Sequence, residues 1–137
     1  MKQIVTTLLC SLFIVVINGC GKDNDETPPP PADTPGTITY TAPSAGFTFA
    51  NGTNLRVSGT AADNDGLRAL KIEVKNATTG TTYFQQELTI AAGVTYNFDQ
   101  SWTVTGITAN TNAIVKVTIT DAYSYKISKD VAVVLQN

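Results

Sequence analysis

The polar side chains best suited to chemistry in this sequence form the acidic segment Asp63-Asn64-Asp65-Gly66. Carboxylate oxygens that alternate along a chain are hard ligands of the kind that calcium binds. The segment is not an EF-hand, because Val74 stands where the loop would need a glutamate and no helical pattern flanks it. The same residue types are ordinary turn formers, whose side chains bond the nearby backbone. Calcium binding and a plain turn therefore both stay open.

Two further carboxylates are expected beside this segment. In a seven-stranded sandwich, the loop after the second strand lies at the same end as the loop after the sixth. Asp121 follows the expected sixth strand and can therefore approach Asp63 and Asp65. The first strand also begins at this end, so Asp33 can supply a further oxygen. We predict a weak calcium site formed by Asp63, Asp65 and Asp121, with calcium as the one candidate cofactor and no cofactor as the alternative.

Composition argues against several classes of function. The chain has no histidine, which removes Ser-His-Asp triads, Cys-His dyads and His-bearing zinc sites. Two carboxylates in a cleft can hydrolyse glycosides. The sequence around Asp63 and Asp65 does not indicate an apolar pocket, and a small sandwich offers little concave surface. Residues 37–137 contain as many basic as acidic residues, so they present no electrostatic footprint for nucleic acid. We expect neither an enzyme nor a nucleic-acid-binding protein.

Two tyrosines flank Ser124 in the hairpin expected between the last two strands. Alternation places Tyr123 and Tyr125 on the same face of that hairpin. Exposed aromatic side chains can stack on sugar rings or anchor a protein partner, whereas buried ones would cap the end of the core. Tyr123 and Tyr125 are therefore candidate binding residues, with core capping as the alternative.

The N-terminal residues have the pattern of a secretory signal peptide. Lys2 precedes an apolar run from Ile4 to Ile17, which as a helix would rise roughly 21 Å and fall short of the roughly 30 Å hydrocarbon layer of a membrane. The sequence Ile17-Asn18-Gly19-Cys20 resembles the lipobox of bacterial lipoproteins, although its second residue departs from the usual small or hydroxyl type. The resemblance implies that residues 1–19 are removed and that the sulfur of Cys20 carries a diacylglyceryl group that attaches the chain to a membrane.

Residues 20–36 lack the apolar content of a folded segment. They contain an acidic tract at 22–26 and four consecutive prolines at 28–31, which favour an extended tether. A lysine followed by acidic residues after the lipidated cysteine resembles the surface-export signal of Bacteroidetes lipoproteins. We expect a cell-envelope protein anchored in the outer membrane and exposed at the cell surface, with a periplasm-facing orientation as the alternative.

From residue 37 onward, apolar and polar residues alternate and turn residues separate the alternating runs. Ile72 and Val117 should face the core, and Lys71 and Lys116 the solvent. The pattern predicts an all-β fold, an immunoglobulin-like antiparallel β-sandwich of about seven strands, with a meander barrel as the alternative. The expected strands are 37–43, 53–62, 67–76, 81–90, 94–104, 113–120 and 127–136.

Residues 37–137 also resemble a known family of domains. The segments 42–46, 55–67 and 117–121 are similar to bacterial Ig-like domains of surface proteins, and Ala62-Asp63-Asn64-Asp65 is similar to the acidic motif of cadherin-like domains. With its anchor, the whole chain resembles small Bacteroidetes lipoproteins that carry one such domain and whose function is largely uncharacterised. Those proteins often have histidines after the third strand, so no metal role that rests on them carries over to this chain.

Anchor, tether and domain together predict a non-catalytic binding or accessory module. Its partners would be the membrane, through the N-terminal lipid, and a protein or glycan. A structural spacer of an envelope complex is the first alternative. A glycan-acting hydrolase is the second, and it would need a deep pocket with perturbed carboxylates.

Overall fold

Strands with alternating buried and exposed side chains account for most of the described chain. The computed structural model describes residues 32–137, and Ala32–Asn137 form one compact unit. Strands are the only regular elements among these residues, which confirms the all-β class, and no helix in them is long and apolar enough to cross a membrane. The signal peptide, Cys20 and the expected tether up to residue 31 lie outside the described residues.

Six strands follow one another, and their limits differ in part from the expected ones. The runs expected at 53–62 and 67–76 join into one strand, and so do those at 81–90 and 94–104. A short strand before residue 51 was not predicted. The strands are β1 (Thr37–Ala42), β2 (Thr48–Ala50), β3 (Asn54–Asn76), β4 (Thr82–Thr103), β5 (Thr111–Asp121) and β6 (Lys126–Gln136).

The two joined strands bend where the sequence predicted turns. The pairing register of β3 with β4 shifts between Ala62 and Leu67, and again between Leu67 and Ala69. Extra residues in one strand of a pair bend that strand and increase its twist without ending the ladder. The turn residues at Asp65-Gly66 therefore form a corner in β3, and the chain passes from one layer to the other without a loop.

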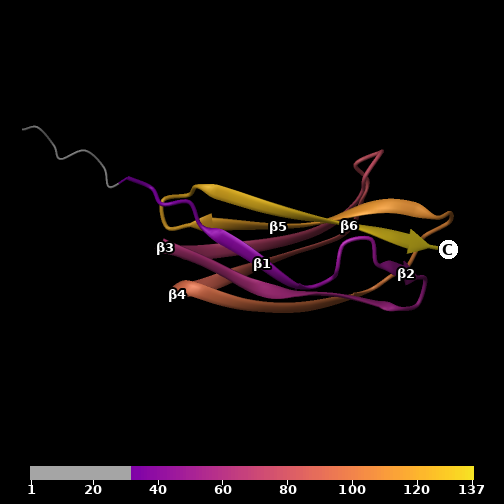
Figure 1. Cartoon of the computed structure of the whole chain (residues 1–137), viewed down its shortest axis with the longest axis horizontal. Coiled ribbons are helices and arrows are strands. Elements are labelled where there is room, and N and C mark those ends of the chain that lie inside the picture. Colours follow the sequence, from indigo (N-terminus) through magenta and orange to yellow (C-terminus); the bar gives the residue numbers. More distant parts are fainter. Residues whose placement is uncertain (1–31) are drawn as a thin grey trace, which may run out of the picture. The chain divides into compact units, whose positions relative to one another are not determined.

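The layers follow from the neighbours of each half of β3 (Figure 1). β4 pairs with both halves, whereas β1 pairs with residues 58–62 and β5 with residues 67–76. β5 continues the second layer to β6. This arrangement confirms the immunoglobulin-like sandwich. The barrel alternative is wrong, because the ladder of described strands ends at β1 and β2 and does not close.

Two details of the sandwich differ from the expectation. β2 pairs with the end of β6 in parallel, so the sheet is not wholly antiparallel. The first half of β4 pairs with the second half of β3 and lies in the layer of β5 and β6. In the constant-type immunoglobulin domain the corresponding strand belongs to the other sheet, so this chain has the variant in which that strand changes layer.

The core fills the space between the layers as the alternation predicts. Ile72 and Val117 are register partners on β3 and β5 and are fully buried, while Lys71 and Lys116 are partly exposed on the outer face. Tyr40 ties β1 to the second layer, because its hydroxyl donates hydrogen bonds to the carbonyl oxygens of Val115 at 3.3 Å and Lys129 at 2.9 Å.

Glu73 is buried although it lies on the outer face of β3, which the alternation predicted to be exposed to solvent. Glu73 lies between Lys71 and Lys75 along β3, and both lysine Nζ atoms stand 2.9 Å from its Oε1. Burial by itself would raise the pKa of Glu73, but the hydrogen bonds from Lys75 and Lys71 outweigh it and hold the pKa below its ordinary value. The long lysine stems cover the carboxylate, which stays ionised.

The described chain begins at one end of the sandwich and its C-terminus lies at the other (Figure 1). We call the first the entry end; it holds Thr34, the bend at 63–66 and the β5–β6 turn at 122–125. The far end holds β2 and the last residues of β6.

Candidate functional site

The entry end brings together the three aspartates that the sequence singled out. Asp63 and Asp65 lie in the bend of β3, and Asp121 is the last residue of β5. The pairing of β3 with β5 places Asp121 opposite Leu67, and the backbone N–H of Ala122 donates to the carbonyl oxygen of Gly66 at 2.9 Å. The end of β5 therefore borders the acidic bend, as the sandwich topology predicts.

Asp63 and Asp65 hold the backbone of the bend and of the incoming chain. Asp63 is only 5% exposed, and its Oδ1 accepts a hydrogen bond from the backbone N–H of Asp65 at 2.9 Å. Asp65 Oδ2 accepts a bond from the N–H of Thr34 at 3.0 Å. Gly36 packs so closely on Asp63 that a Cβ at this position would overlap its Oδ2. Turn chemistry is thus present, and residues 34–36, expected in the tether, contact the domain.

Asp121 is the most buried member of the group, at 2% exposure. Its Oδ1 closes the β5–β6 turn by accepting a hydrogen bond from the N–H of Tyr125 at 2.7 Å. Its Oδ2 is buried and has no hydrogen-bond partner among the described residues. Burying a carboxylate oxygen without a hydrogen-bond partner costs free energy. The role of Asp121 in the turn therefore does not explain why its Oδ2 is buried.

Asp33 approaches Asp121 from the chain before β1. Partial desolvation raises the pKa of Asp33, and repulsion by Asp121, Asp65 and Asp63 raises it further, in that order. A hydrogen bond to Asp121 also contributes to the raised pKa of Asp33, and such a bond requires that one of the two carboxyl groups is protonated. Asp33 therefore lies close enough to the other three aspartates for their charges to interact, and its role as a calcium ligand stays a prediction.

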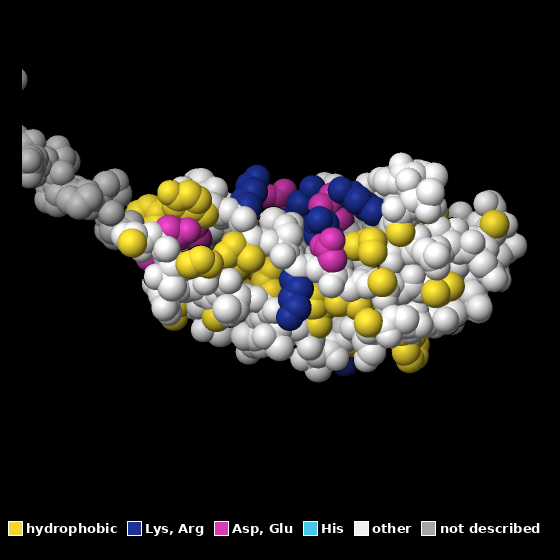
Figure 2. All heavy atoms as spheres, turned by 45° about the horizontal axis from the view of Figure 1, so that its top comes forward, with side chains coloured by type: hydrophobic (Ala, Val, Ile, Leu, Met, Phe, Trp, Pro, Cys, Tyr) yellow, Lys and Arg dark blue, Asp and Glu magenta, His cyan; other side chains and the backbone are white. Residues whose placement is uncertain are grey.

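The carboxylates of the entry end have no cationic partner in the described part of the chain. The salt bridges between residues 32 and 137 involve other acidic residues: Asp99, Glu73 and Asp130. Figure 2 shows acidic side chains at the entry end, apart from the mixed basic and acidic group further along the domain. In residues 32–137, no three acidic or cysteine side chains are already grouped as ligands of a metal ion.

A small polar cavity adjoins the acidic bend. Its volume is about 100 Å³, and it is lined by Thr34, Pro35, Thr37, Ala62, Asp63 and Asn64. Asp65 and Asp121 do not line it. Asp63 is therefore the one carboxylate among its lining residues, whereas glycoside hydrolysis needs two carboxylates around a common cleft.

Tyr123 and Tyr125 lie in and after the β5–β6 turn and are both exposed, at 55% and 57%. The core-capping alternative is therefore wrong for both. The turn turns them outward because Asp121 accepts the N–H of Tyr125 and Ser124 adopts a left-handed φ of 74°. Their exposure leaves them available to a partner at the entry end.

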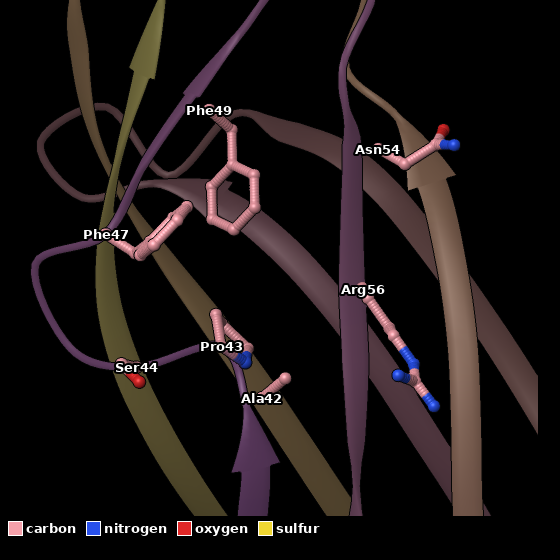
Figure 3. Close-up of a pocket in the computed structure, with 7 residues that line it drawn as sticks. All are labelled: Ala42, Pro43, Ser44, Phe47, Phe49, Asn54 and Arg56. Carbon is pink, nitrogen blue, oxygen red and sulfur yellow. The ribbon is translucent and has the colours of Figure 1, made fainter.

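A second aromatic surface, which the sequence analysis missed, lies at the far end. Phe47 is 57% exposed, and its ring centroid lies 5.0 Å from that of Phe49. The two rings line a pocket of about 220 Å³, and Asn54 and Arg56 on β3 line its other side, with their polar ends directed away from the rings (Figure 3). We call this the far-end pocket; its lining residues are Ala42, Pro43, Ser44, Phe47, Phe49, Asn54 and Arg56. The i, i+2 spacing of the two phenylalanines, which places both on one side of a strand, was the available signal.

The charged group of the far-end pocket is already neutralised. Arg56 Nε and Nη2 donate to the two carboxylate oxygens of Asp99 at 2.7 and 2.5 Å. The Arg56 guanidinium thereby holds the pKa of the Asp99 carboxyl below its ordinary value. Both side chains are exposed. The pocket thus combines an aromatic wall with planar polar groups that carry no net charge.

Comparisons with known proteins find no matching family model and no matching curated protein. Solved structures do match. The fibronectin(III)-like modules of CbhA from Clostridium thermocellum share 19% identity over 73% of this chain and 96% of theirs, with a TM-score of 0.49. Murine CRIg shares 10% identity over 75% of this chain and 98% of its own, with a TM-score of 0.40.

Proposed function

We propose that this protein is a lipid-anchored module of the cell envelope that binds a neutral glycan without catalysis. The exposed aromatic wall of the far-end pocket carries the proposal, because adjoining apolar side chains left exposed around a pocket mark interaction sites more often than single exposed residues do. The sandwich itself is the fold of a binding or structural module.

A sugar ring matches the chemistry of the far-end pocket. The apolar faces of a pyranose can pack on the ring of Phe47, while its hydroxyl groups need both donors and acceptors around the edge. Asn54 offers both, and the paired Arg56 and Asp99 offer donors beside acceptors. Because the ion pair is neutral as a unit, a charged ligand would gain little there, which favours a neutral sugar over an acidic one.

Phe47→Ala should weaken binding of a neutral glycan about tenfold, since loss of a stacked aromatic contact costs about 1.4 kcal/mol. The measurement is affinity electrophoresis of the full chain in detergent against neutral polysaccharides (a glucan, a mannan and a xylan), with an acidic polygalacturonan for comparison. Tyr123→Ala is the matched control, because that ring is equally exposed but lies at the entry end.

The outcomes separate the possible binding surfaces. Retarded migration that Phe47→Ala abolishes and Tyr123→Ala leaves unchanged supports the far-end pocket. The reverse pattern would transfer binding to Tyr123 and Tyr125. Equal migration of all variants on every polysaccharide would overturn the glycan proposal and would leave a protein partner or the spacer role.

The membrane anchor is part of the proposal and rests on the lipobox-like sequence that ends at Cys20. Cys20→Ser should abolish incorporation of a fatty-acid analogue, because only a thiol can form the thioether to the diacylglyceryl group. The experiment labels growing cells that express either chain and follows the label on a gel. Absence of label on the unmutated chain, or equal label on both, would contradict the anchor.

Outer-membrane display at the surface is proposed from the acidic tract after Cys20. In intact cells, an externally added protease should then degrade the domain, whereas a periplasm-facing domain would be protected. The spacer role is the second candidate, because the described chain enters and leaves the sandwich at opposite ends (Figure 1). A spacer should keep its cellular role when Phe47 and both tyrosines are replaced together.

A further inference from the structure

We propose that Asp121, Asp63, Asp65 and Asp33 bind a divalent cation, calcium by ligand type, and that the cation fastens the chain before β1 to the entry end of the sandwich. This site is separate from the far-end pocket and does not depend on the proposed glycan binding.

The first support is convergence of carboxylates from three separate parts of the chain. Asp63 and Asp65 come from the bend of β3, Asp121 from the end of β5, and Asp33 from the segment before β1. The hydrogen bond from Thr34 to Asp65 and the close packing of Gly36 on Asp63 hold that segment over the bend. Fold and contacts thus bring four carboxylates to the same end of the sandwich, although no three of them are grouped as ligands in the structure.

The second support is the buried oxygen of Asp121. Its Oδ1 is occupied by the N–H of Tyr125, whereas its Oδ2 is buried and unpartnered. Among the acidic residues of the entry end, Asp121 repels the Asp33 carboxylate more than Asp65 or Asp63 does. A buried carboxylate normally has a cation or several donors around it. A bound cation would supply the missing partner of Oδ2 and would replace the repulsion between Asp121 and Asp33 by a shared attraction.

The donor atoms select the class of cation. Neither histidine nor described cysteine is available, so nitrogen and sulfur ligands are missing from residues 32–137. Carboxylate oxygens, with the carbonyl and hydroxyl oxygens of the adjoining cavity, are hard ligands that suit calcium, whose coordination tolerates irregular geometry. Since the carboxylates are not yet grouped as ligands, binding must draw Asp33 and Asp65 toward Asp121, and the affinity should be that of a weak extracellular site, with Kd of roughly 10⁻⁴ to 10⁻³ M.

The experiment is a thermal melt of the full chain in detergent, with calcium or with a chelator. About 2 mM calcium should raise the melting temperature by about 3–8 °C. Asp121→Asn should remove this rise. In chelator the same variant should melt no lower than the unmutated chain, because an asparagine side-chain oxygen can still accept the N–H of Tyr125 while the repulsion with Asp33 is gone.

Controls separate cation binding from a structural role. Asp33→Asn should reduce the calcium-induced rise without lowering the melting temperature in chelator, whereas Glu87→Gln, an exposed carboxylate on β4, should leave the rise unchanged. Terbium luminescence sensitised by tyrosine gives a direct second readout, since Tyr125 adjoins Asp121. A melting temperature equal in calcium and chelator, no terbium signal, or a calcium effect that survives Asp121→Asn and Asp33→Asn would each overturn the site.

Discussion

Ile72→Ala should lower the free energy of unfolding by about 2–5 kcal/mol, since it removes three buried carbon atoms and leaves a cavity that the neighbours cannot fill. Ile72 is fully buried on β3 and pairs with Val117 on β5, at the centre of the second layer. Chemical unfolding of the full chain in detergent measures the loss. The fluorescence of Trp102, the chain's only tryptophan, reports the transition because its ring stacks on Phe84.

Lys71→Ala is the control for this substitution, because Lys71 precedes Ile72 on the same strand and faces outward. It removes one of the two lysines that neutralise Glu73, so its cost should stay below about 1 kcal/mol. A loss at Lys71 as large as that at Ile72 would mean that the register of β3 is shifted by one residue, which would exchange the two faces.

Gly59→Ala should destabilise the domain by about 3 kcal/mol or more, through overlap with the neighbouring strand. A Cβ on Gly59 would overlap the carbonyl oxygen of Thr39 and would stand 2.7 Å from Cζ of the buried Phe98. Neither obstacle can turn aside, since one is backbone and the other is a core ring held edge-on to Tyr40. β1 must therefore move away from β3, and the same unfolding experiment should show the loss.

Gly93→Ala provides the matched control, because a Cβ there meets only backbone oxygens at 3.7 and 3.8 Å. We expect a change within about 0.5 kcal/mol. If both glycine variants were equally stable, the close pairing of β1 with β3 at Thr39 would be incorrect. Loss of stability in both would point to backbone flexibility and not to a steric cause.

Local patterns were sufficient to predict the faces of the strands but not their ends. The burial of Leu70, Ile72 and Val74 on β3 follows from alternation, because each strand has one face toward the core. The bend at Asp65-Gly66 looks like a loop in sequence, since the same residues suit a turn and a bulge. Whether the ladder continues through such residues depends on β4 opposite, which bends at the same place.

The features of the two candidate sites that the sequence could not predict depend on contacts between residues far apart in the chain. The approach of Asp121 to the acidic bend was predictable, because it follows from strand order alone. The unpartnered Oδ2 of Asp121 was not, since it depends on a side-chain orientation set by the N–H of Tyr125. The i, i+2 spacing of Phe47 and Phe49 indicated a shared side of the chain but not its exposure, because that exposure depends on the parallel pairing of the short β2 with β6.

The position of the far-end pocket in the chain has a mechanical consequence. Five of its seven lining residues lie between the last residue of β1 and the middle of β2, and the other end of β1 leads toward the N-terminus: Ala42, Pro43, Ser44, Phe47 and Phe49. If the proposed ligand and the proposed N-terminal anchor pull against each other, the tension would run along the covalent backbone of β1. The hydrogen bonds of β1 to β3, and those of residues 46 and 47 to β6, would hold this segment in place without carrying the pull through the core. The force would then act on the segment from β1 to β2, and the rest of the sandwich would hold that segment in place without being pulled apart.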